Sequence, residues 1–214
     1  MIAVTFAHPS ESRDFVRLTH PRPNEIQIFH TGVGGKTCRE RLEPFLKSQP
    51  IDLLISSGFA GGIDPSLGVG DLLLAENHSA PQLLERAREI LIARVGKLAT
   101  TERVVEGAAE RERLAKEHRA VAVDMETEWI ARACAAHQIP MLSLRAISDT
   151  AAAPFPAPPN VLFNLQRQRT NLLRLTGYLV THPLAIAGLT RFARQVSSAR
   201  ASLTGGLAIL VREL

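Results

Sequence analysis

The fold is decided by the run Val121-Ala-Val-Asp-Met-Glu126, a helical segment, and then Met141-Leu-Ser-Leu-Arg-Ala-Ile-Ser-Asp149. Each of the two quoted runs is apolar, has the length of a strand and ends on an acid. Between them, residues recur at the spacing of one helix face, namely Ile130, Ala133, Cys134 and His137. Pro140 then ends the helix. This order predicts a right-handed βαβ unit with two parallel strands.

Charged residues gather at the ends of these two predicted strands. Glu126 and Asp149 lie at the carboxyl ends, where such sheets bind ligands. Alternation along the second strand places Arg145 and Asp149 on one face and the leucines on the other. A buried arginine is costly unless it pairs with an acid. The pattern therefore indicates a site, with one alternative: that Arg145 forms a structural ion pair with Asp124 or Glu126.

Outside this stretch, strands alternate with helices, which is typical of the α/β class. We expect strands at 2–7, 25–29, 51–55 and 70–75, an extended segment at 97–105, and helices at 12–18, after 35, at 81–92 and at 108–118. A proline-rich segment at 151–159 precedes two helices, at about 160–178 and 183–204. The prediction is one domain, 1–214, with three layers, helices around a central mixed twisted sheet, and a helical C-terminal extension from about 160.

Composition excludes several classes of protein. The chain has 214 residues, of which 45% are hydrophobic, so it is long and apolar enough to bury a core. Neither a run of about 20 apolar residues nor a basic leader before the first strand is present. The two cysteines, Cys38 and Cys134, fall within predicted helices and indicate a reducing compartment, with the cytoplasm as the default.

The net charge is +4, and much of the excess lies near the end of the chain. Six arginines and no acid occur between Arg167 and Arg200. Such helices meet nucleic acid, an anionic membrane or solvent. Aromatic residues do not interleave with these arginines as on base-stacking surfaces, so we expect no nucleic-acid binding and favour solvated helix faces.

Two glycine-rich stretches are candidate ligand loops. Gly58-Phe-Ala-Gly-Gly62 follows a strand but no helix follows it, so it is equally a turn or a ligand loop. Gly32-Val-Gly-Gly-Lys-Thr37 resembles the end of a phosphate-binding P-loop, but His30 stands where that motif needs its first glycine. Glu11 lies in a predicted loop past the first strand. The histidines lack the ligand spacing of a zinc site, and no metal is expected.

Three motifs together resemble the nucleoside phosphorylase and nucleosidase superfamily, which includes purine nucleoside phosphorylases and methylthioadenosine/S-adenosylhomocysteine nucleosidases. The motifs are Ser57-Gly-Phe-Ala-Gly-Gly62 with Val69-Gly-Asp71, then Ala122-Val-Asp-Met-Glu126, then Leu144-Arg-Ala-Ile-Ser-Asp149. The Asp-Met-Glu-Thr variant, the segment Thr101–Val105 and the proline-rich stretch most resemble the hopanoid-associated phosphorylase branch.

The resemblance implies a role for each matching residue. Asp149 matches the general acid that protonates N7 of the purine, which requires a desolvated carboxyl group whose pKa is held up. Glu11 matches the acid that activates the attacking water, and Arg145 would help to hold that water or the acids around it. Glu126 matches the acid that grips the ribose hydroxyls. The other implied substrate-binding residues are Met125, Phe59, Ala60, Gly61, Val104, Val105 and Ser148.

Departures from the family pattern bear on the substrate and the nucleophile. The segment between Asp71 and Glu126 is short and lacks aromatic residues, which implies an open site and a bulky 5′ group. No arginine stands just before Ser57, where phosphorylases of this type commonly place a phosphate ligand, although Arg13, Lys36 or Arg39 could substitute. The expectation is therefore hydrolysis.

The combined prediction is an enzyme that cleaves the N-glycosidic bond of a purine nucleoside, with adenine as the expected base. Its alternatives are a phosphorylase that uses phosphate as co-substrate, and a non-catalytic nucleoside-binding protein of the same fold. No cofactor is expected. By analogy with the family we expect a homo-oligomer, with a dimer favoured. As a further hypothesis, the C-terminal helices touch a membrane peripherally.

Overall fold

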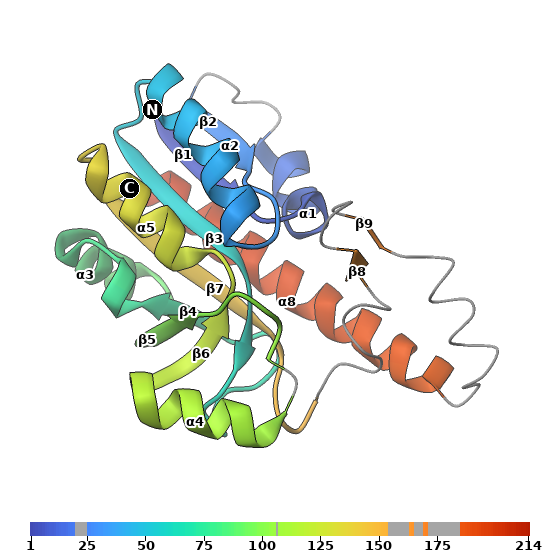
Figure 1. Ribbon diagram of the computed structural model, residues 1–214. Helices are drawn as coiled ribbons and strands as arrows, with labels where there is room; N and C mark the ends of the chain where they lie inside the picture. Colours follow the sequence, from blue (N-terminus) through green and yellow to red (C-terminus); the bar gives the residue numbers. More distant parts are fainter. Residues whose placement is uncertain (20–24, 106, 154–162, 165–168, 171–184) are drawn as a thin grey trace.

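In a computed structural model, residues 1–19, 25–105, 107–153, 163–164, 169–170 and 185–214 are described (Figure 1). Helices lie on both sides of a mixed sheet, which confirms the α/β class. Within these ranges, no helix is long and apolar enough to cross a membrane.

Seven strands form the sheet: β1 (Ile2–Phe6), β2 (Ile26–His30), β3 (Leu53–Gly62), β4 (Leu72–Ala75), β5 (Arg94–Thr100), β6 (Ala120–Asp124) and β7 (Met141–Asp149). Their order is β2-β1-β3-β6-β5-β4-β7, and β3 also pairs with β7. This extra pairing closes β3, β7, β4, β5 and β6 into a ring, while β1 and β2 extend the sheet from β3. The ring interior is filled by small and aliphatic side chains: Ala60, Leu67, Leu73, Ala75, Leu98, Ala122 and Ile147.

The predicted parallel βαβ unit is wrong. Helix α5 (Thr127–Ala136) does connect β6 to β7. However, β6 pairs antiparallel with β3, with Val123 opposite Gly61, whereas β7 pairs parallel with β3, with Arg145 opposite Gly58. The two strands therefore run in opposite directions and are not neighbours. Strand-helix-strand periodicity reports the elements but not the strand that each one pairs with, and here a third strand separates them.

The glycine stretch at 58–62 is neither a turn nor a loop, because β3 continues through it to Gly62. Gly58 has a φ of 156°, in the region that favours glycine. Gly61 and Gly62 pair with β6 on one side while Gly61 also pairs with β7 on the other. Because glycine has no side chain, β3 can bend here and pair with β6 and β7 at once. The pairing with distant strands therefore overrides the local turn signal.

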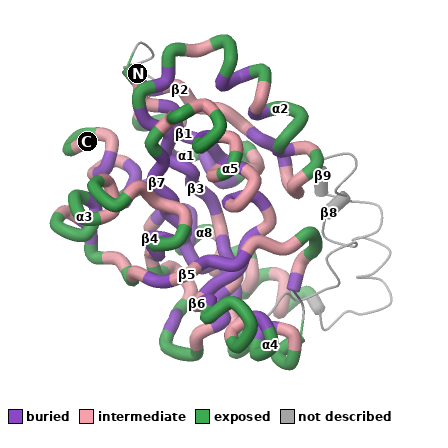
Figure 2. The backbone as a smooth tube through the Cα atoms, turned by 60° about the vertical axis from the view of Figure 1, so that its left-hand side comes forward, coloured by how far each residue is buried: buried purple, intermediate pink, exposed green. Residues whose placement is uncertain are grey.

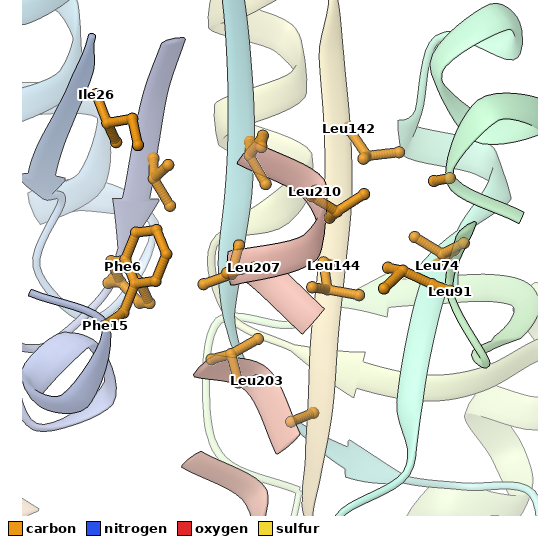
Figure 3. Close-up of a cluster of buried hydrophobic side chains, with 14 of the residues drawn as sticks. Phe6, Phe15, Ile26, Leu74, Leu91, Leu142, Leu144, Leu203, Leu207 and Leu210 are labelled. Carbon is orange, nitrogen blue, oxygen red and sulfur yellow. The ribbon is translucent and has the colours of Figure 1, made fainter. Parts of the chain in front are cut away.

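Two helical layers cover the sheet. On one face lie α1 (Pro9–Thr19), α3 (Pro81–Ile90) and α8 (Ala185–Glu213), and on the other lie α2 (Gly35–Ser48) and α5. Helix α4 (Ala108–His118) covers β5 and β6. Figure 3 shows Leu203, Leu207 and Leu210 of α8 pointing between the Phe6 side of the core and Leu144. Figure 2 shows burial concentrated along β3 and β7.

The C-terminal region differs in part from its prediction. The expected helix at about 183–204 is confirmed as α8, which runs on to Glu213. The helix expected at about 160–178 is wrong for Phe163–Asn164 and Arg169–Thr170, which form the paired strands β8 and β9. The rest of that range and residues 154–159 of the proline-rich segment lie outside the described residues. Arg200 is not solvated as expected, because it pairs with Asp14 of α1 at 2.8 Å.

Candidate active site

Glu11 lies against the glycine-rich half of β3. It belongs to the first turn of α1, which begins at Pro9, so the predicted loop is wrong here; proline suits the first turn of a helix. The backbone N–H groups of His8 and Phe59 donate to its two carboxylate oxygens at 2.9 and 3.1 Å. A Cβ on Gly58 would lie 3.2 Å from one of these oxygens, so the glycine makes room for the acid. Burial raises the pKa of Glu11, against the opposing effect of the two N–H donors.

Glu126 is the second buried acid. It stands directly before α5, and the N–H of Gly34 donates to it at 2.7 Å. Burial, together with the nearby charge of Asp124, raises its pKa to about 8. The stretch that resembles a P-loop therefore lies beside Glu126. Met125 is half-buried next to it.

Arg145 occupies the centre of the site, with a side chain that is 2% exposed. Its Nε donates to Asp124 at 3.1 Å, and its Nη2 donates to the hydroxyls of Ser56 at 2.8 Å and Thr127 at 2.5 Å. Of the two partners weighed for a structural pair, Asp124 is the one found. The positive charge also lowers the pKa of Glu11 and of Glu126, although in each case burial has the larger effect.

Asp149 ends β7 at a break in the strand register. Ile147 lies opposite Ala60 and Asp149 opposite Gly61, so β7 carries one extra residue, Ser148. Such a bulge re-aims side chains. The predicted alternation holds for Arg145 and for Leu144, which packs under α8, but does not extend across the bulge to Asp149.

A second buried arginine, Arg111 of α4, pairs with Asp149, and the sequence reading missed it. Its Nη2 donates to Asp149 Oδ2 at 2.5 Å and its Nη1 to the carbonyl of Gly62 at 2.6 Å. The hydroxyl of Ser148 donates to Oδ1 at 2.9 Å. Asp149 is desolvated as expected, but it has an arginine partner. The only local signal was Arg111 beside Leu114 on the inner face of a helix that otherwise reads as polar.

The remaining candidate residues surround these acids. The side chain of Ala60 fills the ring interior, and its carbonyl accepts a 3.5 Å contact from Ser148. Gly61 leaves space for the Asp149–Arg111 pair, because a Cβ there would lie 3.1 Å from Oδ2 of Asp149. Val105 is buried under α4, and Val104 is half-buried. Phe59 contributes its N–H to Glu11 while its ring packs on the α8 side.

Trp129 of α5 adjoins the Glu126 region. A Cβ on Gly35 would lie 2.2 Å from the indole nitrogen, so only glycine fits there. The guanidinium of Arg39 lies 4.6 Å from the ring centroid. Arg39 is thereby turned to the indole, Lys36 is 85% exposed beside Glu40, and Arg13 contacts Asp14. Among the described residues, no group of three metal-binding side chains gathers.

Known proteins resemble this chain in sequence and in fold. A family model described as the phosphorylase superfamily matches residues 79–181. This match confirms the resemblance of the sequence motifs to that superfamily. A 5′-methylthioadenosine/S-adenosylhomocysteine nucleosidase of Staphylococcus aureus is 24% identical over 161 residues, which cover 61% of this chain and 71% of that protein.

Solved structures share the fold of this protein, and the matches cover 100% of the chain. Futalosine hydrolase of Helicobacter pylori matches with a TM-score of 0.75 at 17% identity, covering 100% of this chain and 97% of that one. The 5′-methylthioadenosine/S-adenosylhomocysteine nucleosidase of the same organism, with butyl-thio-DADMe-Immucillin-A, has a TM-score of 0.75, 17% identity and coverage of 100% and 98%. These similarities confirm the nucleoside phosphorylase-like architecture.

Proposed function

We propose that this protein is a nucleosidase, which hydrolyses the N-glycosidic bond of a purine nucleoside. The observation that carries the proposal is that Glu11 and Asp149 lie against Gly58 and Gly61 in the glycine-rich half of β3. The third acid, Glu126, lies close enough to Glu11 that, after burial and the charge of Asp124, the charge of Glu11 also raises its pKa. The superfamily match and the nucleosidase relatives support the same activity. Glu11 and Glu126 are each held by backbone N–H groups, and neither forms an ion pair among the described residues.

The reaction breaks the bond between C1′ of the ribose and N9 of the purine. The oxygen of water forms the new bond to C1′ while Glu11 takes its proton, a role that suits a buried carboxylate whose pKa is raised by desolvation. The bonding pair leaves with N9, and the purine takes a proton at N7 from Asp149. Glu126, with a pKa of about 8, can donate one hydrogen bond and accept another, which matches the two ribose hydroxyls.

Water is favoured over phosphate by what surrounds Glu11. The two N–H groups identified there, of His8 and Phe59, are already used by the carboxylate. The three cations that could have replaced the missing phosphate ligand, Arg13, Lys36 and Arg39, all have other contacts. A phosphate dianion needs such donors.

One observation favours phosphorolysis as a second candidate. Arg41 reaches back to the glycine stretch, with Nη1 3.5 Å from the position of a Cβ on Gly32. Its charge helps to lower the pKa of His30, after the larger effects of burial and of His8. A cation beside backbone glycines is suited to an anion.

The finer features of the proposal rest on the resemblance. We propose adenine as the base, a bulky apolar 5′ substituent of the hopanoid-associated type, no cofactor, and a homo-oligomer in the cytoplasm. Peripheral membrane contact through α8 is part of the same hypothesis. Flotation with anionic liposomes tests that contact, and protein that stays wholly unbound contradicts it.

The test is a panel of purine nucleosides assayed for free base, with and without phosphate. We expect adenine release without phosphate, and a fall of about 10²- to 10⁴-fold in Glu11→Gln and in Asp149→Asn. Base release that requires phosphate and is lost in Arg41→Met would favour phosphorolysis. Binding without release in the wild type would leave the non-catalytic alternative.

A further inference from the structure

Arg111 makes a contact that the proposed mechanism does not use. It comes from α4, outside the ring, and its side chain is 4% exposed. Three acceptors hold the guanidinium: Asp149 Oδ2 at 2.5 Å, the carbonyl of Gly62 at 2.6 Å and the carbonyl of Val105 at 3.4 Å. A solvated surface arginine would not have three protein acceptors. Arg111 is therefore a buried cation that is fixed at the end of β7.

The two oxygens of Asp149 consequently have different surroundings. Oδ2 faces Arg111, a permanent donor that cannot accept a proton. Oδ1 faces the hydroxyl of Ser148 at 2.9 Å, and a hydroxyl can turn either to donate or to accept. The guanidinium N–H already occupies one lone pair of Oδ2, so the geometry favours Oδ1 as the oxygen that carries an acidic proton.

We propose that Arg111 is a positioning residue for the base site. Its guanidinium is anchored on the Gly62 carbonyl and donates to Oδ2 of Asp149, so it fixes the orientation of the carboxyl group. Oδ1 is then the oxygen that delivers the proton to N7 of the purine. Gly61 makes this possible, because a Cβ there would lie 3.1 Å from Oδ2 and 3.2 Å from Nη1 of Arg111. The inference rests on the proposed function and adds a residue to it.

The experiment compares two leaving groups in Arg111→Met, with Arg113→Met as the matched control. Arg113 lies on the same helix but is 61% exposed, and it forms an ion pair with Glu110. An ordinary purine nucleoside needs a proton at N7, whereas a 7-methylpurine nucleoside already carries the positive charge and needs none. In Arg111→Met we expect kcat on the ordinary nucleoside to fall about 100-fold, within the range of a lost general acid. We expect a change of less than about threefold on the 7-methylated one and in KM, since only proton delivery is affected.

Two further variants keep the test decisive. Arg111→Lys retains the charge but not the planar fork, and we expect an intermediate loss of about tenfold. In Arg111→Ala, added guanidinium chloride should restore at least tenfold of the lost rate, and sodium chloride at equal ionic strength should not. The rescue requires no 7-methylated substrate.

Failure of the proposal differs from failure of the proposed function. No base release from any nucleoside by the wild type would remove the nucleosidase assignment itself. An active wild type with equal losses on both leaving groups, no guanidinium rescue, or a comparable loss in Arg113→Met would overturn the role of Arg111.

Discussion

Two buried arginine–aspartate pairs can be compared directly in this protein. Arg145 with Asp124 lies between β7, β6 and α5, and Arg111 with Asp149 joins α4 to the end of β7. All four side chains are less than 5% exposed. Arg145 also binds two hydroxyls, whereas the further partners found for Arg111 are backbone carbonyls. The first pair thus lies within the framework of the sheet, and the second joins a helix outside the ring to Asp149, the proposed general acid.

The largest effect that we expect is on stability, from Arg145→Met. Removing this guanidinium leaves Asp124 buried without its charged partner, which costs about 3–5 kcal/mol of unfolding free energy. Arg111→Met should cost less, about 1–3 kcal/mol, because α4 lies outside the ring and can shift to admit water. Urea unfolding at one pH measures both.

The double variant Arg145→Met/Asp124→Asn is the control for this comparison. Removing both charges should recover part of the loss, since the penalty comes from the unpaired carboxylate. Equal losses in the two single arginine variants would mean that the two pairs do not differ in the way proposed.

The next effect concerns an acid without an arginine partner, Glu126. Its pKa in the folded protein is about 8, above the ordinary glutamate value of 4.5, so the folded state holds the proton more tightly. Stability should therefore fall as pH rises from the ordinary value of 4.5 towards the folded value of about 8. The loss should be on the order of 2 kcal/mol between about pH 5 and pH 7. Glu126→Gln should lose this dependence. Thermal unfolding across pH measures it, and identical slopes in the two proteins would contradict the assignment.

The smallest effect should come from a third arginine pair, Arg200 with Asp14. Here the hydrogen bond from Arg200 is the main cause of the lowered pKa of Asp14, but that carboxylate is 35% exposed. We expect Arg200→Met to cost about 0.5–1 kcal/mol, reduced by salt. The surface pair Arg212–Glu213 supplies the control, and Arg212→Met should change nothing measurable.

The site could be read from the sequence only where the pattern is local. Arg145 drew attention because an arginine inside an apolar strand demands an acid, and Asp124 is found there. The local pattern around Glu11, by contrast, is that of an ordinary surface glutamate, and only the family resemblance predicts a catalytic role for it. Neither the local pattern nor the resemblance predicts a role for Arg111. It lies in a helix rich in charged residues, so its sequence does not distinguish it from exposed arginines, and its partner Asp149 is 38 residues away.

The fold shows the same limit. Periodicity located nearly every helix and strand, but the direction of β6 relative to β7 depends on β3, which bends at its glycines to meet both. Local turn signals at Gly58–Gly62 pointed away from a strand, although pairing on both sides makes one. Pairing between distant strands is not written in the period of any one segment.

The tight fit of Gly35 against the indole of Trp129 has a practical consequence. The chain has a single tryptophan, so its tryptophan emission, excited selectively at the red edge of the absorption band, comes from Trp129 alone. The indole packs against Gly35, and the preceding residue, Gly34, donates its N–H to Glu126. A ligand that draws on Glu126 would disturb Gly34, and through Gly35 the surroundings of the indole. Trp129 is therefore a built-in optical reporter for the proposed ribose site at Glu126, and titration of wild-type fluorescence can follow binding there without a label.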